Sequence, residues 1–177
     1  MRRFTFDPQK ALEAILYVVA RLPRPTLHTV SKVLYFADQK HLRDYGRLIF
    51  GDGYVAMKHG PVPSGAYDIL KAARGDGSSF RGLDPAVVAT SLTVNGGHLV
   101  AARRDALADE LSESDREAME WSIGEYGGLS FSQLTERSHD PAWESADEND
   151  LIDLAAIVSQ QPNAAELREY LELEADA

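Results

Sequence analysis

Five histidines are the side chains of this sequence best suited to metal binding or acid–base chemistry. They are His28, His41, His59, His98 and His139. No two of them have the His-Glu-x-x-His spacing, which places two imidazoles on one face of a helix to hold zinc. The sequence contains no cysteine, so thiolate metal sites, disulfides and cysteine nucleophiles are excluded. We therefore expect each histidine to have a structural or surface role, and we expect no bound metal.

A dense group of carboxylates is the second place where chemistry could occur. Its members are Glu110, Glu113, Asp115, Glu117 and Glu120. Acidic side chains are common where a helix begins, because they complement the positive end of its dipole, and the density of the group favours this interpretation. Neither a Gly-x-Ser-x-Gly nucleophile elbow nor a phosphate-binding Walker loop is present. The sequence thus predicts a protein that is not an enzyme and that uses no cofactor.

Charge is divided unevenly along the chain, whose net charge is -10. Residues 1–104 carry 15 Lys and Arg against 8 Asp and Glu, a net +7, whereas residues 105–177 carry 3 against 20, a net -17. The acidic half would repel a phosphate backbone and attract a basic partner, although an acidic surface also serves solubility. Basic and aromatic residues are interleaved in 32–36 and 40–45, a pattern that can bind nucleic acid. A DNA-binding regulatory protein that uses residues 1–104 is therefore an alternative, which the overall acidity disfavours.

Length and composition bound the class of protein. The chain has 177 residues, which is typical of one domain and enough to bury a core without disulfides. No stretch approaches the ~20 apolar residues of a membrane span, and the first residues lack the apolar core and cleavage site of a signal peptide. We expect one soluble, cytoplasmic domain over residues 1–177, with no membrane partner.

Two helices are predicted in the first part of the chain by their caps and their apolar spacing. Asp7 followed by Pro8 is typical of a helix start, and Pro23 ends this first helix. A second helix is predicted to begin at Thr26, with apolar residues at steps of three and four and with Gly46 placed to end it.

The segment 47–63 is rich in glycine and proline. Only Tyr54–Met57 is predicted to form a strand, and the rest is expected to be an ordered surface loop, where binding residues are common. Pro61 and Pro63 would hold this loop rigid, because proline fixes φ, and a preorganised loop loses little entropy on binding. Helical spacing resumes after Ser64.

A β-hairpin is predicted around Asn95-Gly96, the dipeptide that favours a type I′ turn. A two-residue turn there would pair Val94 with Gly97 and would place Leu92 opposite Leu99 on one face.

The acidic half is predicted to be helical. The expected helices cover 114–126, the residues from Ser130 up to 139–141, and 164–174. Three residues of the last helix, Leu167, Tyr170 and Leu171, are expected to face inward. The fold class predicted is α+β, a helix-rich single domain with a small antiparallel β-sheet or hairpin.

Two blocks of residues carry a recognisable pattern of glycines, aromatic residues and a Gly-Pro pair. The first block consists of 32–38 (KVLYFAD), 41–42 (HL), 45–47 (YGR), 49–52 (IFGD), 54–63 (YVAMKHGPVP) and 67–70 (YDIL). The second consists of 129–130 (LS) and 138–143 (SHDPAW). In order and spacing, these residues resemble the Panacea domain, the family of SocA-like antitoxins.

This resemblance implies an antitoxin that neutralises a cognate protein toxin by direct protein–protein contact. Family members are often encoded beside the toxin gene or in phage, which implies that the toxin is the product of the adjacent gene and that the pair serves phage defence. Some relatives also hand the toxin to a protease, so a proteolytic adaptor is an alternative. Other relatives carry an additional DNA-binding domain, of which this sequence has no sign.

The polar and aromatic residues of the first block are the candidate toxin-binding residues. They are Tyr35, Asp38, Tyr45, Arg47, Asp52, Tyr54, Lys58 and His59. The alternative interpretation is that these residues hold the segment 47–63 to the second helix, with Asp38, Arg47 and Asp52 paired internally, since family motifs often encode the fold. A further hypothesis assigns toxin capture to the acidic half, which would attract a basic toxin surface.

Overall fold

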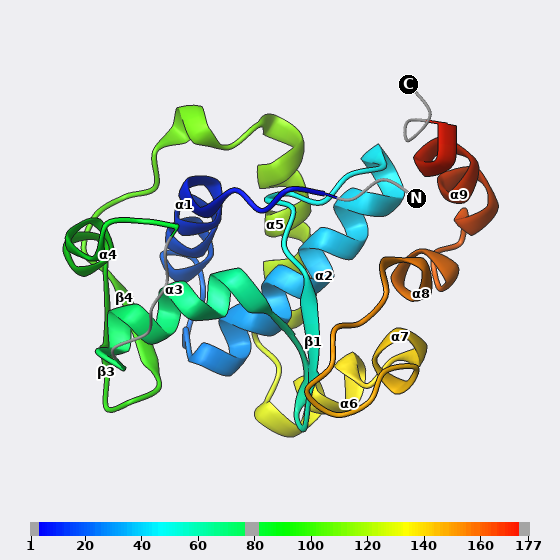
Figure 1. Ribbon diagram of the computed structural model, residues 1–177. Coiled ribbons are helices and arrows are strands. Elements are labelled where there is room, and N and C mark those ends of the chain that lie inside the picture. The colour runs from blue at the N-terminus through cyan, green and yellow to red at the C-terminus, as the bar shows by residue number, and fades with distance from the viewer. Residues whose placement is uncertain (1–3, 77–81, 174–177) are drawn as a thin grey trace.

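The computed structural model describes residues 4–76 and 82–173 of the chain (Figure 1). Helix α1 comprises Pro8–Val19. Its start follows the prediction, because the Asp7 side chain accepts a hydrogen bond from the Lys10 amide at 3.0 Å and Pro8 occupies the first turn. Residues 11–19 are all buried, so α1 is an internal helix that other elements cover on every side.

Helix α1 carries one fully buried carboxylate, Glu13. The Arg104 guanidinium donates to both of its oxygens, at 2.6 and 2.9 Å, and the Leu107 amide donates at 2.8 Å. A buried charge is tolerated when it is paired and hydrogen-bonded in this way. The pair ties α1 to the segment 104–107.

Helix α2 (Leu27–Tyr45) is the central element of the fold. It runs diagonally through the middle of Figure 1 and contacts α1, α5 (Glu113–Tyr126) and several smaller elements. Both predicted ends are confirmed: the Thr26 side chain accepts from the Thr29 amide at 3.0 Å, and Gly46 adopts the left-handed conformation with φ +67°.

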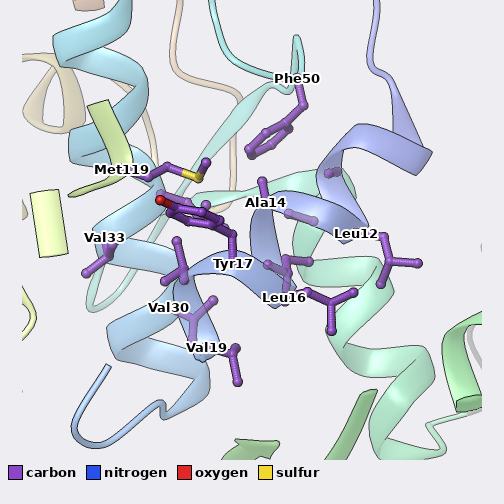
Figure 2. Packing of buried hydrophobic residues seen from close by; sticks show 14 of the residues in the cluster. Leu12, Ala14, Leu16, Tyr17, Val19, Val30, Val33, Phe50 and Met119 are labelled. Atoms are coloured by element: carbon purple, nitrogen blue, oxygen red, sulfur yellow. The ribbon is translucent and has the colours of Figure 1, made fainter. Parts of the chain in front are cut away.

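The main core lies between α1, α2, α5 and α3 (Ser64–Arg74). Figure 2 shows side chains of this cluster, among them Leu12 and Leu16 of α1, Val30 of α2 and Met119 of α5. All four are fully buried, and burial of a side chain of this size contributes ~1.5–3 kcal/mol relative to exposure. A second cluster, centred on Tyr35 and Tyr54, packs the C-terminal helices against the other side of α2.

The segment 47–63 differs from the predicted surface loop. Leu48, Ile49 and Phe50 are buried, with at most 6% of their surface exposed, and two strands follow them. Strand β1 (Tyr54–Met57) is as predicted, but β2 (Gly60–Pro63) was not predicted, and the two form an antiparallel hairpin. The prediction was wrong because the apolar residues of this segment fill the core, whereas its glycines and prolines are typical of exposed loops.

The prolines of β2 occupy the outer edge of the hairpin. Residues 149–152 pair with β1 on its other side, where the Asn149 amide donates to the Ala56 carbonyl and the Ile152 amide donates to the Tyr54 carbonyl. Ala56 and Tyr54 thus direct their backbone groups away from β2, so their partners Pro61 and Pro63 also direct theirs outward. Because proline has no N–H, the outer edge lacks donors at both positions, and this blocks the pairing of a further strand.

The second hairpin, formed by β3 (Leu92–Asn95) and β4 (Leu99–Ala102), follows the short helix α4 (Pro85–Ser91). Its predicted register was wrong: Asn95 pairs with Leu99 and Leu92 with Ala102, so three residues form the turn. Contacts with the start of α2 account for the difference, because the Leu27 amide donates to the His98 carbonyl and the Val100 amide donates to the Pro25 carbonyl. These bonds fix β4 independently of the turn.

The C-terminal part of the chain is helical, as predicted, but in more pieces. After η1 (Ala108–Glu110) and α5 come α6 (Phe131–Ser138), α7 (Pro141–Glu144), α8 (Leu154–Ser159) and α9 (Ala164–Leu173). In Figure 1, α6 to α9 follow one another along the right-hand side. Helices α5, α6 and α9 were predicted, whereas α4, α7 and α8 were not.

Inward-facing residues of the last helix are only partly as predicted. Leu167 and Leu171 are buried, but Tyr170 is 45% exposed and its ring lies against Gly46. Residue 174, the predicted helix end, lies outside the described residues. The fold is helix-rich α+β with two small antiparallel sheets, and no helix in the described ranges is both long and apolar enough to cross a membrane.

Candidate functional site

Asp38 anchors the segment after α2 back onto that helix. Its carboxylate accepts from the Ile49 amide at 2.7 Å and from the Tyr54 hydroxyl at 2.6 Å. Burial raises the pKa of Asp38 to about 7, although these two hydrogen bonds oppose the rise. Asp38 and Tyr54 are only 1% and 2% exposed, so a partner protein cannot touch them in this conformation.

Asp52 caps α3 from a distance. The residue at the cap position of α3 is Pro63, whose side chain makes no cap hydrogen bond. The carboxylate of Asp52 instead accepts from the Gly65 and Ala66 amides, both at 2.9 Å, and from its neighbour Gly53 at 2.8 Å. Because the first amides of a helix otherwise lack partners, Asp52 supplies the cap that Pro63 cannot. This buried aspartate is therefore a structural residue.

Tyr35 joins the two blocks of the sequence pattern. Its hydroxyl donates to the Asp140 carboxylate at 2.8 Å, and Asp140 also caps α7 by accepting from the Trp143 amide at 3.0 Å. The Trp143 indole N–H in turn donates to the Met57 carbonyl at 3.0 Å. Residues more than 80 positions apart thus hold the β1–β2 hairpin against α7.

Tyr45 and Arg47 lie at the C-terminal end of α2 and face α5. The Tyr45 hydroxyl donates to Glu117 at 3.1 Å, and Arg47 Nη2 lies 3.1 Å from Asp115 Oδ1. Asp115 is fully buried and also pairs with Lys10 at 2.7 Å. Asp38, Arg47 and Asp52 therefore all have partners within the fold, as the interpretation of these residues as structural predicted. They do not pair with one another, which that interpretation had expected.

Lys58 and His59 are the two candidate residues whose side chains extend from the tip of the β1–β2 hairpin. Both are exposed, and Lys58 forms no ion pair with any residue in the described ranges. The His59 ring meets Phe131 of α6 edge-on, with the ring centroids 5.2 Å apart, and Phe131 stacks on His28 at 4.1 Å. We call Met57, Lys58, His59, His28 and Phe131 the hairpin-tip surface.

A pocket of about 260 Å³ opens in the hairpin-tip surface. Its lining comprises Leu27, His28, Ser31, Lys32, Met57, Lys58, His59, Gly60, Val62, Tyr67 and Phe131. Lys32, on α2, is the most buried charged residue of this lining, at 1% exposure. Glycine at position 60 allows the β1–β2 hairpin to pack closely against Lys32 and Ser138. Its φ of +98° suits glycine, and a methyl group there would collide with Ser138 Oγ and Lys32.

Lys32, His28 and Phe131 were not among the predicted site residues. Burial lowers the pKa of Lys32 to about 7, and burial together with the charge of Lys32 lowers the pKa of His28 to about 4. The sequence offers no signal for Lys32, because a lysine within a helix is normally exposed, and only the structure shows that residues 29–38 of α2 are buried on every face. Phe131 carries no signal either, because a lone aromatic residue is equally common in a core.

Metal ligation is not indicated by side-chain positions. Among residues 4–76 and 82–173, no three His, Asp or Glu side chains come close enough together to hold an ion. His41, for example, is buried between the Arg47 carbonyl at 2.8 Å and Asp115 at 3.3 Å.

The fold and the two joined blocks define the class of protein. The model of the family "Antitoxin SocA-like, Panacea domain" matches residues 30–144. This match covers more than half of the chain, so the chain belongs to that family. No curated protein and no solved structure matches it. The matched region begins inside α2 and ends with α7, and α1, α8 and α9 lie outside it. It contains Met57, Lys58, His59 and Phe131 of the hairpin-tip surface but not His28.

Proposed function

We propose that this protein is the antitoxin of a toxin–antitoxin pair and neutralises its toxin by direct binding through the hairpin-tip surface, without catalysis. Membership of the SocA-like antitoxin family supports the role. One observation supports the choice of this surface. Of the candidate toxin-binding residues, Tyr35, Asp38, Asp52 and Tyr54 are buried and form internal hydrogen bonds. Lys58 and His59 are exposed at a fixed turn.

Rigidity makes the hairpin tip suitable for binding. β1 is paired on both sides, with β2 and with residues 149–152, and the Trp143 indole holds the Met57 carbonyl next to the turn. A surface that is already ordered pays little conformational entropy on binding. Exposed aromatic residues such as Phe131, which is 53% exposed, are also enriched at interface hot spots when a partner covers them.

The acidic half contributes a charged border to the same surface. A second pocket of about 380 Å³ is lined by Lys58 and Trp143 together with Glu144 and Glu148. The exposed acidic residues of the loop between α7 and α8 therefore begin beside the hairpin tip. They would steer a toxin with a basic surface towards it, which combines the two hypotheses for toxin capture.

Binding of DNA through residues 1–104 has less support, because much of the positive charge there is already paired. Arg21 pairs with Glu120, Lys10 and Arg47 with Asp115, and Arg104 with Glu13. Such charges are not free to neutralise phosphates. Transfer of the bound toxin to a protease is compatible with the proposal, and it would show as faster toxin degradation when both proteins are present.

Removing the exposed side chains of the hairpin tip is expected to weaken toxin binding. The double variant Lys58→Ala/His59→Ala should bind the product of the adjacent gene at least tenfold more weakly, a loss of about 1.4 kcal/mol that is typical of interface hot spots. Isothermal titration calorimetry measures this change. Lys40→Ala is the matched control, because Lys40 lies on α2 and pairs with Asp44. Equal affinity of the double variant and the wild type would remove the hairpin tip from the interface.

A further inference from the structure

The Lys32 amine is buried without a counter-ion. Its Nζ donates to the Pro61 carbonyl at 2.8 Å, and no carboxylate within the described residues lies within ion-pair distance of it. Glu13 and Asp115, which are also buried, pair with Arg104 and Lys10. Asp38 and Asp52 are buried without a counter-ion in the described part of the chain, but each accepts two or more hydrogen bonds. An unpaired buried ammonium is costly, and the Lys32 amine is held by its hydrogen bond to the Pro61 carbonyl and by no ion pair within the described residues.

A hydrogen bond to the Pro61 carbonyl does not by itself require a lysine. This carbonyl points away from β1, at the outer edge of β2, and needs one donor. A neutral hydroxyl or amide side chain supplies such a donor without a charge. The positive charge of Lys32 is therefore unexplained by the internal contacts of the fold, and the pocket beside it offers an explanation.

The pocket is built for an anchor with a negative charge. Leu27, Val62, Tyr67 and Phe131 provide apolar walls, and the charged or titratable residues that line it are Lys32, Lys58, His28 and His59. None of its described lining residues is Asp or Glu. At about 260 Å³ it is smaller than the ~300–1,000 Å³ of most small-molecule pockets, and it suits one or two side chains of a protein.

We infer that this pocket receives a carboxylate-bearing anchor of the toxin, an Asp or Glu side chain next to an apolar residue, and that the carboxylate pairs with Lys32 Nζ. The identity of the partner rests on the proposed function, but the chemistry of the anchor rests on the pocket. The apolar walls exclude water from the pair, which strengthens it. Lys32 and Lys58 select against basic anchors, because like charges repel each other where little water separates them.

The test uses a probe that does not depend on the toxin. A library of random peptides displayed on phage is selected against the full-length chain, and the selected peptides are titrated into wild type, Lys32→Met and the control Lys40→Met. We expect peptides enriched in Asp or Glu beside an apolar residue, which bind Lys32→Met at least 30-fold more weakly and Lys40→Met unchanged. Failure to select any peptide, selection of peptides without carboxylates, or equal affinity for Lys32→Met would overturn the inference.

A second arm separates this inference from the proposed function. The product of the adjacent gene is titrated into the same three proteins, and the same loss is expected with Lys32→Met. If acidic peptides bind as expected but the gene product does not bind any of the proteins, the proposed function fails for that pair and the pocket assignment stands. If the gene product binds wild type and Lys32→Met equally, toxin binding stands and the pocket assignment is wrong.

Discussion

Replacing Asp52 with alanine is expected to lower the free energy of unfolding by about 3 kcal/mol, because three backbone amides lose their acceptor. Two of these amides, of Gly65 and Ala66, lie in the first turn of α3, and the third belongs to Gly53. Loss of an ordinary helix cap costs about 0.5–2 kcal/mol, and burial of Asp52 adds the penalty of unsatisfied groups that water cannot reach. Urea unfolding followed by circular dichroism measures the change.

Two further variants of acidic residues make this prediction specific. Asp52→Asn keeps one carbonyl acceptor and should lose less than half as much stability. Asp68→Ala removes a partly exposed carboxylate of the same helix, paired with Lys71, and should change stability by less than about 0.5 kcal/mol. A loss below about 1 kcal/mol for Asp52→Ala would contradict the assignment of this family-pattern residue as the remote cap of α3.

Replacing Lys32 with methionine is expected to have the opposite effect and to stabilise the fold at pH 6. Burial lowers the pKa of Lys32 from 10.5 to about 7, and a lowering of this size corresponds to roughly 5 kcal/mol of destabilisation while the amine is charged in both states. Loss of the bond to the Pro61 carbonyl offsets about 1–3 kcal/mol of this. We expect a net gain of about 2–4 kcal/mol from the variant.

The pH dependence of this gain has a definite sign. The unfolded chain binds the extra proton up to about pH 10.5, whereas the folded chain releases it near pH 7, so wild-type stability rises relative to the variant between these values. The gain should be largest below pH 7 and should shrink by at least about 1 kcal/mol between pH 6 and pH 9. Urea unfolding of both proteins at several pH values tests this. A gain that does not change with pH would show that the Lys32 pKa is not lowered.

A lysine that destabilises its own fold is expected to persist only where its charge is needed for function. Proteins tolerate such costs where activity requires a strained or charged site. In this chain the destabilising residue, Lys32, lines the pocket of the hairpin-tip surface. It lies beside Gly60, where Lys32 and Ser138 leave no room for a larger side chain. The unfolding experiment therefore measures the stability that the charge of Lys32 costs, and the peptide experiment measures the binding that this charge provides.

Helices of this protein could be predicted from the sequence where local signals agree. Asp7 with Pro8, Thr26 and Gly46 mark helix ends through their own backbone and side-chain chemistry, and the structure uses each of them in that way. Ser130 behaves likewise, since it forms a capping box with Gln133 at the start of α6. These features depend on residues a few positions apart, which is why a single sequence contains enough information.

Features that depend on distant contacts could not be predicted. The turn at Asn95-Gly96 favours a two-residue loop, but the hydrogen bonds from the Val100 amide to the Pro25 carbonyl and from the Leu27 amide to the His98 carbonyl determine the register instead. The segment 47–63 has the composition of a loop, but Ile49 and Phe50 are buried against α1 and α2. In both cases tertiary contacts outweigh the local preference.

The candidate site shows the same limit. Polar and aromatic residues such as Asp38 and Tyr54 are as typical of a binding surface as of a buried hydrogen-bond network, and only their partners distinguish the two. Half of the predicted toxin-binding residues are buried, and Tyr45 and Arg47 contact α5. Lys58 and His59 are the members that the proposal retains. Lys32 enters the site because the pocket, and not the sequence pattern, places it there.

Neutralisation by direct contact is tested most directly by co-expressing this chain with the product of the adjacent gene. Growth and co-purification are scored together for the wild type, for Lys58→Ala/His59→Ala and for the control Lys40→Ala. We predict that the wild type and the control restore growth and co-purify with the toxin, whereas the double variant does both less well. Growth arrest that persists with wild-type protein present in folded form, and with no complex recovered, would contradict the proposal that this protein neutralises that toxin.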